Sequence, residues 1–517
     1  MAGTVVDADG PVAGATVRVQ TTTHATQTDS EGRFVLAVSG DGPFKLTAWA
    51  EGYFCVGPVE AEAGATDVEL LLVAHNAEDN PAYEWLPSRF HAGQGESQGC
   101  AECHSAAGAE LTFTLPVDEW QRDAHSQSAT NPRFLTMYLG TDVNGNQSPL
   151  TRYGYNRDYG RFPLRPDLSQ PYYGPGYKLD FSETAGNCAA CHTPAAAVNA
   201  AYSTNPTQPS GVESEGVPCD FCHKIWDVHL DPAGGLPYPN MPGVLSYEFR
   251  RPHDDHQFFA GPLDDVAPGE DTYSALQTES VFCAPCHFGV FWDTVIYNSF
   301  GEWLASPYSD PLTGRTCQDC HMPPLGATHF ALPEQGGLAR DPQTIFSHYM
   351  PGAADETLLQ NTAELRLVAE REGDQIAVTV EVTNTEAGHH MPTDSPLRQI
   401  FVVVSATDAQ GTPLALEGGP VLPDWAGELQ GQPGDYFAKI LQETWTEIMP
   451  SGAYWNPTRT VEDTRLAALE SRTSTYVFAI PEGARDGAIT VEARLIFRRA
   501  FYDLMQQKGW DVPDIQM

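Results

Sequence analysis

The chain lacks any run of about 18 uninterrupted apolar residues, the length that a membrane-spanning helix requires. We therefore expect no membrane span, and a chain that is soluble or attached to a membrane by something outside this sequence. A signal peptide is also missing. The first residues, AGTVVDADG, are typical of a β-strand, so we expect that the N-terminus has been processed or shortened.

Basic residues are scarce. The 517 residues include 28 Lys and Arg against 68 Asp and Glu, which gives a formal charge of −40. Such a chain has no basic face to neutralise phosphates, which excludes nucleic acid as a partner. The acidity favours solubility outside the cell; the alternatives are attraction of cationic partners and assembly bridged by divalent cations.

Calcium is a candidate cofactor at one acidic loop. The segment TDVNGNQ places Asp142, Asn144 and Asn146 in the style of a calcium-binding loop. The segment lacks the glycine and the closing glutamate of an EF-hand, so the pattern is weak.

The spacing of the cysteines is the most specific feature of the sequence. Ten of the eleven cysteines form five C-x-x-C-H motifs, which are Cys100–His104, Cys188–His192, Cys219–His223, Cys283–His287 and Cys317–His321. A C-x-x-C pair serves structural zinc, a redox dithiol or covalent haem attachment. A structural zinc ion needs four ligands, usually supplied by two C-x-x-C pairs. Five pairs would leave one pair that cannot complete a zinc site. A redox dithiol needs no histidine and is normally single. Five copies with a trailing histidine therefore predict five haem c groups.

The spacing suits haem chemistry. Cysteines three positions apart lie about one helical turn from each other, so both sulfurs can bond one side of a haem. The histidine that follows can then ligate the iron. The predicted thioether residues are Cys100, Cys103, Cys188, Cys191, Cys219, Cys222, Cys283, Cys286, Cys317 and Cys320, and the predicted proximal ligands are His104, His192, His223, His287 and His321.

The composition and the hydrophobic pattern of the sequence change twice along the chain. Residues 1–76 alternate apolar and polar side chains between glycine and aspartate turns, which predicts a small β-sandwich. Residues 77–357 are rich in Pro, Gly, Tyr and Asn and predict an irregular, loop-rich multihaem core. Its few short helices are expected in PVDEWQRDAH and in DPQTIFSHYM, the latter capped by Asp341. Residues 358–517 alternate again and predict a larger C-terminal β-sandwich with a terminal helix, RAFYDLMQQKG. The expected fold is thus multidomain, with a multihaem core flanked by two β-sandwich domains.

The N-terminal segment carries a family resemblance. The string GTVVDADGPVAGATVRV…TDSEGRFVL…AWAEGY resembles carboxypeptidase-regulatory-like β-sandwiches, which usually serve in packing or adhesion. We assign no chemistry to this segment. Cys55, the eleventh cysteine, is expected to be a buried small hydrophobe, and the alternative is an intermolecular disulfide.

The distal iron ligands are expected among the other eleven histidines. The segments EWQRDAHSQSA and CHMPPLGATHF resemble the multihaem family related to cytochrome c554 and hydroxylamine oxidoreductase, which points to His125 and His329. The segment AGHHMPTDSPLRQ resembles the GHxxP segment of many multihaem cytochromes, which points to His389. His348 lies on the second expected helix. His256 is chosen as the fifth, ahead of His253, His91 and His229. The alternative for each is a surface histidine or a donor to a haem propionate.

Methionine is the alternative ligand type. Met322 and Met391 lie close in sequence to the expected ligands. Because histidines are plentiful, we expect all-histidine, low-potential haems.

The expected function is electron transfer without substrate chemistry. We expect an extracellular, periplasmic or cell-surface protein that exchanges electrons with other redox proteins or extracellular acceptors. Resemblance to extracellular cytochrome filaments in haem density favours a homopolymer with haem contacts between subunits. The alternative is an oxidoreductase acting on nitrite, hydroxylamine or a sulfur compound, but all five motifs end in histidine and none is the C-x-x-C-K of pentahaem nitrite reductases. A structural protein decorated with haem is the third class.

Overall fold

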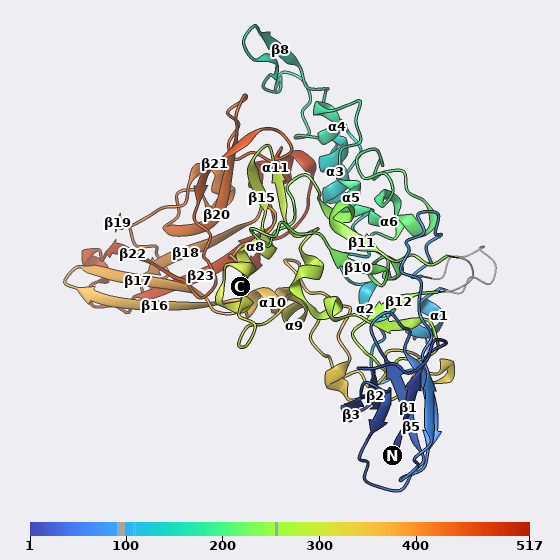
Figure 1. The fold of residues 1–517 in the computed structure, drawn as a ribbon. Helices are drawn as coiled ribbons and strands as arrows, with labels where there is room; N and C mark the ends of the chain where they lie inside the picture. Colours follow the sequence, from blue (N-terminus) through green and yellow to red (C-terminus); the bar gives the residue numbers. More distant parts are fainter. Residues whose placement is uncertain (90–98, 107, 109, 254–256) are drawn as a thin grey trace. The chain divides into compact units, whose positions relative to one another are not determined.

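The computed structural model describes residues 1–89, 99–106, 108, 110–253 and 257–517 (Figure 1). The chain divides into two compact units, each assembled from three separate segments. The first comprises 1–129, 186–285 and 316–350, and the second comprises 130–185, 286–315 and 351–517. Each unit contains one β-sandwich core. None of the helices in the described part of the chain combines the length and the apolar character needed to cross a bilayer.

The first unit begins with the small β-sandwich expected at the N-terminus. Its two sheets have the strand orders β4-β1-β7 and β3-β2-β5-β6. Inward side chains of both sheets, including Val5, Val17, Phe34 and Leu46, form the core. Cys55 is fully buried, as expected, and burial raises the pKa of its thiol. The strands are β1 (Ala2–Val6), β2 (Thr16–Val19), β3 (Ala25–Gln27), β4 (Arg33–Val35), β5 (Phe44–Trp49), β6 (Val56–Ala61) and β7 (Val68–Leu71).

The rest of the first unit is irregular, with single-turn helices and two-stranded ladders. The helices are α1 (Ala101–His104), α2 (Pro116–Trp120), α5 (Ala189–His192), α6 (Pro194–Ala197), α7 (Cys219–Cys222) and α9 (Cys317–His321). The strands are β10 (Ile225–Val228), β11 (Tyr247–Phe249), β12 (Phe259–Gly261) and β13 (Asp271–Tyr273). The 3₁₀ turns are η1 (Gly211–Ser214), η2 (Gly243–Ser246), η3 (Ala275–Thr278), η4 (Ser280–Cys283), η6 (Pro333–Gln335) and η7 (Pro342–Thr344).

Both helix predictions in this region were too long. The helix α2 ends at Trp120, because Asp123 Oδ1 accepts the N–H of His125 and thereby competes with a helical hydrogen bond. The second segment forms only the 3₁₀ turn η7, although Asp341 caps it as expected by accepting the N–H of Gln343 at 3.0 Å. His125 and His348 therefore lie outside helices.

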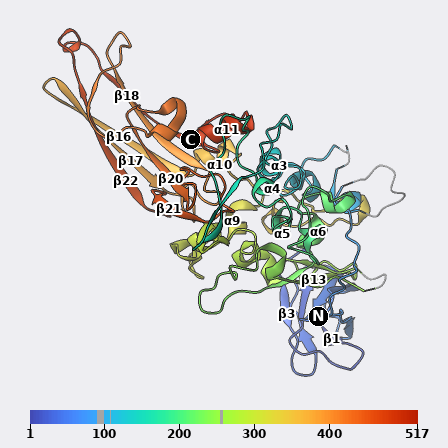
Figure 2. The same cartoon turned by 90° about the horizontal axis from the view of Figure 1, so that it is seen from above.

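The second unit contains the larger β-sandwich predicted for the C-terminal part. Its sheets have the orders β16-β17-β22-β19 and β21-β20-β18-β23-β24. Figure 2 labels β16, β17 and β22 of the first sheet and β18, β20 and β21 of the second. Alternate residues of β17, such as Val378 and Val380, share one core with Val402 and Val404 of β18. The strands are β16 (Ala363–Glu372), β17 (Gln375–Asn384), β18 (Gln399–Thr407), β19 (Leu416–Gly418), β20 (Gly434–Glu443), β21 (Thr458–Asp463), β22 (Ser471–Ala479), β23 (Thr490–Arg498) and β24 (Ile515–Gln516).

Short elements complete the second unit. The predicted terminal helix is present as α11. The helices are α3 (Pro132–Leu139), α4 (Tyr177–Asp180), α8 (Ser299–Leu304), α10 (Glu356–Gln360) and α11 (Tyr502–Lys508), and the 3₁₀ turns are η5 (Pro307–Ser309), η8 (Asp424–Leu429) and η9 (Glu482–Ala484). Two hairpins are formed by β8 (Tyr153–Asn156) with β9 (Gly160–Pro163) and by β14 (Gly289–Phe291) with β15 (Thr294–Tyr297).

Candidate haem centres

The C-x-x-C-H motifs adopt the local structure that their spacing requires. Four of the five coincide with single-turn helices, α1, α5, α7 and α9. The fourth begins at Cys283, the last residue of the turn η4, and continues as a turn. One helical turn brings the two sulfurs of a motif to the same side of the chain, as haem attachment needs.

The first and third motifs touch each other. The side chains of Cys100 and Cys219 are hydrogen-bonded to each other, and this contact together with burial raises the pKa of Cys100. Both cysteines pack against one apolar cluster, formed by Ala101, Val117 and Trp120. Groups attached to these two cysteines would therefore be neighbours.

The fourth and fifth motifs also touch. The side chains of Cys283 and Cys317 are hydrogen-bonded to each other, and this contact lowers the pKa of Cys317 to about 7. Further bonds join the helix α9 to the turn η4 and to the residue before it: the Cys317 N–H donates to Ser280 Oγ at 2.9 Å, and Gln318 Nε2 donates to the Glu279 carbonyl at 2.8 Å. The two motifs are thus fixed against each other.

A glycine joins the second motif to the fourth. The N–H of Gly243 donates to the carbonyl of Pro285, within the fourth motif, at 2.8 Å. A Cβ at Gly243 would collide with the carbonyl of Ala190 and would lie 2.8 Å from Sγ of Cys191, both in the second motif. With a φ of +55°, this position favours glycine for its backbone conformation as well.

The segment 125–128 joins the second motif to the third. Ser128 Oγ donates to the carbonyl of His192 at 2.8 Å. The carbonyl of His125 accepts the N–H of Val217, two residues before Cys219, at 3.0 Å. The contacts therefore form a continuous series in the order first, third, second, fourth and fifth motif.

Two of the expected proximal histidines are oriented by carbonyl groups. His104 Nδ1 lies 2.6 Å from the carbonyl of Phe330, and His223 Nδ1 lies 2.8 Å from that of Ala260. A carbonyl at Nδ1 holds the hydrogen there and leaves the Nε2 lone pair for a metal. Burial lowers the pKa of both imidazoles, which favours the neutral form that a metal requires. The other three, His192, His287 and His321, are half-buried beside their cysteines.

One expected distal histidine faces a proximal one. The ring centroids of His223 and His348 are 6.4 Å apart and their planes are inclined by 26°. Two imidazoles that share one metal ion at a metal–nitrogen distance of about 2 Å have centroids roughly 6 Å apart. Burial lowers the pKa of His348 to about 4, and repulsion from His223 and His104 adds to the effect. The spacing and the neutral state both fit an iron held between these two rings.

Glu119 of the helix α2 holds the His348 segment. Its buried carboxylate accepts the N–H of His348 at 2.7 Å and the hydroxyl of Ser347 at 3.1 Å. These bonds replace the helical hydrogen bonds that were expected around His348. Sequence reasoning missed Glu119 because its partners lie more than 200 residues further along the chain.

Three other distal candidates have Nδ1 engaged by an oxygen. His125 Nδ1 lies 2.6 Å from the buried carboxylate of Asp123, and His329 Nδ1 lies 2.9 Å from the hydroxyl of Thr328. His389 Nδ1 lies 2.9 Å from the carbonyl of His390. An oxygen at Nδ1 orients an imidazole for ligation through Nε2. The fifth candidate, His256, lies outside the described residues.

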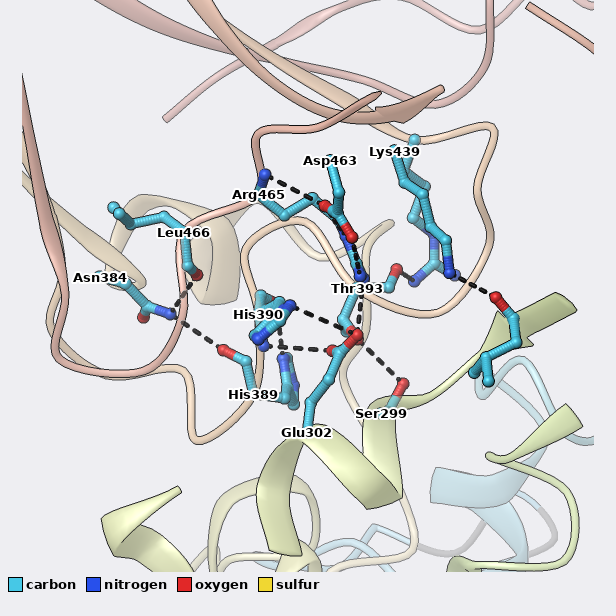
Figure 3. A network of polar contacts seen from close by, with 12 residues as sticks. Ser299, Glu302, Asn384, His389, His390, Thr393, Lys439, Asp463, Arg465 and Leu466 are labelled. Carbon is cyan, nitrogen blue, oxygen red and sulfur yellow. Dashed lines mark hydrogen bonds and ion pairs between the residues drawn. The ribbon is translucent and has the colours of Figure 1, made fainter. Parts of the chain in front are cut away.

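A buried carboxylate fixes the loop that carries His389 (Figure 3). Glu302 of the helix α8 accepts Arg465 Nη1 at 2.6 Å, the N–H of His390 at 3.2 Å and the hydroxyl of Thr393. The Glu302 side chain is 1% exposed. A buried charge with an arginine partner and further donors is fully compensated, so Glu302 anchors both ends of the His389–Thr393 loop.

A buried histidine that sequence reasoning left out lies in the first unit. His75 is 8% exposed, and neither ring nitrogen has a hydrogen-bond partner in the described part of the chain. The rings of Phe54, Trp226 and Phe258 surround it at centroid distances of 5.6, 5.5 and 4.9 Å. The aromatic partners are far apart in sequence, so no local pattern could have found this cage.

The methionine and metal-ion alternatives have less support. Met391 packs into the core of the C-terminal sandwich. Both carboxylate oxygens of Asp142 accept hydrogen bonds within their own loop, from the N–H groups of Asn144 and Asn146 and from the Asn146 amide. Among the described residues, no group of three or more His, Cys, Asp or Glu side chains is arranged to hold a metal ion. The calcium prediction stays untested.

Comparison with known proteins supports the fold. Residues 1–70 match the family model of the carboxypeptidase regulatory-like domain, in agreement with the resemblance noted in the sequence. The chain is similar to the crystal structure of a penta-heme cytochrome c552 from Thermochromatium tepidum, with a TM-score of 0.53 and 20% identity over 81% of this chain and 95% of that chain. A search of curated proteins found no match. The chain thus resembles that structure in its overall fold, and its first 70 residues match a carboxypeptidase regulatory-like domain.

Proposed function

We propose that the chain transfers electrons through five covalently bound haem c groups, each with two imidazoles on its iron. The observation that carries the proposal is the continuous series of contacts between the five motifs. The residues fit the group: each motif offers two sulfurs within one turn and an adjacent imidazole. Haem held in this way supplies a one-electron couple, and the protein sets its potential through the axial ligands and burial.

The order of the contacts suggests the order of transfer. Electrons would pass from the first haem to the third, then to the second, fourth and fifth. The Cys100–Cys219 and Cys283–Cys317 contacts support close neighbours at the two ends of this series. His348 is proposed as the distal ligand opposite His223, and His125, His329, His389 and His256 as those of the other four irons.

The two sandwiches are proposed as docking modules. In this scheme residues 1–76 and 358–517 flank a pentahaem domain of residues 77–357. We place the protein outside the cytoplasm, in the periplasm, at the cell surface or beyond, where it would pass electrons to other redox proteins or extracellular acceptors.

Self-assembly into a filament is proposed on the properties of the β8–β9 hairpin. Its exposed side chains include Tyr155 and Tyr159, which are 79% and 69% exposed. Four of the chain's 28 basic residues are exposed between positions 152 and 165, namely Arg152, Arg157, Arg161 and Arg165. A chain with a net charge of −40 offers many acidic surfaces to such a hairpin, so charge complementarity favours a second copy as its partner.

The haem-loaded full-length protein provides the test. We expect five haems per chain by pyridine haemochrome assay, low-spin iron by EPR, and a reversible reduction without turnover of nitrite or hydroxylamine. A high-spin signal that shifts on addition of nitrite or hydroxylamine would instead support the oxidoreductase. Electron microscopy tests assembly separately: a monomer without fibres would remove the filament and leave electron transfer in place.

A further inference from the structure

Two arginines meet at one end of the C-terminal sandwich. The antiparallel register of β18 and β23 pairs Gln399 with Arg498. One step beyond that pair, Arg398 and Arg499 therefore come opposite each other on the neighbouring strand ends. Alternation along a strand places both on the opposite face of the sheet from Arg498.

These two arginines have few partners. Arg398 Nη1 donates to the carbonyl of Thr393 at 3.0 Å, and Arg499 Nη2 donates to the carbonyl of Ala353. The Nε atoms of both are buried without a hydrogen-bond partner. Within the described residues, the only ion pair of either is that of Arg398 with Asp394, at 3.9 Å. By contrast, the neighbouring Arg498 forms a two-pronged pair with Asp514.

A third arginine reaches the same place from the helix α3. Met137, one turn after Arg133 on α3, packs in one cluster with Leu397 and Ala500, the sequence neighbours of Arg398 and Arg499. The three guanidinium groups repel one another: burial and then repulsion from Arg398 and Arg133 lower the pKa of Arg499 to about 9. Burial and then Arg398 lower the pKa of Arg133.

Among the described residues, the only carboxylate paired with any of these three neighbouring cations is Asp394, at 3.9 Å from Arg398, so the arrangement is incomplete. Burying a cation without a counter-charge is costly, and this chain holds only 28 basic residues against 68 acidic ones. The guanidinium group presents a planar fork of donors that matches a carboxylate or an oxyanion. We propose that Arg133, Arg398 and Arg499 form a binding site for one such anion.

The anion has two sources with the same chemistry. One is a propionate of a bound haem, since the loop from Thr393 to Arg398 begins four residues after His389. The other is a small oxyanion from solution, with sulfate as the probe. The propionate source rests on the proposed haem binding, whereas the solution source does not. Haem content, measured separately on each sample, distinguishes failure of this site from failure of haem binding.

The experiment uses the haem-loaded full chain and its Arg398→Gln and Arg499→Gln variants. Arg472→Gln is the matched control, because Arg472 is an arginine of the same sandwich that is already paired with a carboxylate, Asp435. The apparent melting temperature is followed with increasing sodium sulfate against sodium chloride of equal ionic strength. The haem potentials of all four proteins are measured by spectroelectrochemistry.

For a solution anion, we expect a saturable, sulfate-specific rise in melting temperature, with affinity weakened about tenfold or more in both site variants and unchanged in Arg472→Gln. For a propionate, we expect no sulfate-specific rise, but one haem potential lower in both site variants than in the control, because a positive charge near that haem is lost. If sulfate acts as chloride does and no potential changes, the proposal is overturned. Should Arg499→Gln not fold, Arg133→Gln on α3 gives the same readouts.

Discussion

The imidazole rings of His223 and His348 face each other with centroids 6.4 Å apart and planes inclined by 26°. His223 closes the third C-x-x-C-H motif, whereas His348 stands in a loop whose N–H groups are held by Glu119 and Ser347. The two rings are therefore brought together by tertiary hydrogen bonds rather than by a shared element. Their spacing is that of two ligands on opposite sides of one iron.

Replacing His348 by alanine tests this relationship. We expect His348→Ala to convert one of five haems from low spin to high spin, because its iron loses the sixth ligand while its thioether bonds remain. EPR of the oxidised protein measures the change. His229→Ala is the control: His229 is an exposed histidine near the same motif and should leave all five signals unchanged. Five low-spin haems in His348→Ala would assign the ligand elsewhere.

The features of the candidate site that depend only on residues close together in the sequence could be predicted. The five motifs, their turn structure and the burial of Cys55 follow from spacing and composition alone. Alternating patterns likewise predicted β17, β18, β22 and β23. The long-range partners were not predictable. The role of Glu119 depends on residues more than 200 positions away, which no local pattern reveals.

A glycine substitution tests the link between the second and fourth motifs. Gly243→Ala adds a Cβ that collides with Ala190 and Cys191 at a backbone φ of +55°. We expect it to lower the free energy of unfolding by about 2 kcal/mol or more and to slow electron transfer between the two haems. Chemical denaturation and flash photolysis measure the two effects.

The variant Gly211→Ala serves as a control that distinguishes the effect of backbone strain from the effect of the steric collision at Gly243. Gly211 has nearly the same φ, +58°, but a Cβ there would meet no atom within 4 Å. In Gly211→Ala, the left-handed backbone conformation should lower the free energy of unfolding by only about 1 kcal/mol. The rates of electron transfer should stay normal. Equal losses in the two variants would show that Gly243 is needed for its conformation alone.

The β8–β9 hairpin is the surface to change for assembly. The double variant Tyr155→Ser with Arg157→Glu removes an exposed ring and reverses an exposed charge. If the hairpin docks on an acidic surface of a second copy, the concentration at which fibres form should rise by about tenfold. Leu312→Ser with Arg485→Glu makes the same charge change and replaces another exposed apolar side chain by serine elsewhere, and it should have no effect. Equal effects of both double variants would mean that only net charge matters.

The caged histidine His75 predicts how stability depends on pH. Burial, followed by repulsion from Arg250, lowers the pKa of His75 to about 4, against 6.5 for an unperturbed histidine. At a pH between these two pKa values, His75 is therefore protonated in the unfolded chain and neutral in the folded chain. Protonation of His75 therefore does not reduce the free energy of unfolding above pH 6.5. As the pH falls from 6.5 toward 4, it lowers that free energy by roughly 3 kcal/mol in all.

Phenylalanine at this position should remove that dependence. A phenyl ring can keep the edge-to-face contacts with Phe54, Trp226 and Phe258 but cannot bind a proton. We expect urea denaturation of His75→Phe to show a smaller loss of stability between pH 7 and pH 4.5 than the unmodified protein shows. His24→Phe, at an exposed position, should retain the full loss. The same loss in His75→Phe as in the unmodified protein would mean that protonation of the caged ring does not drive acid unfolding, because the remaining titrating groups are shared by both proteins.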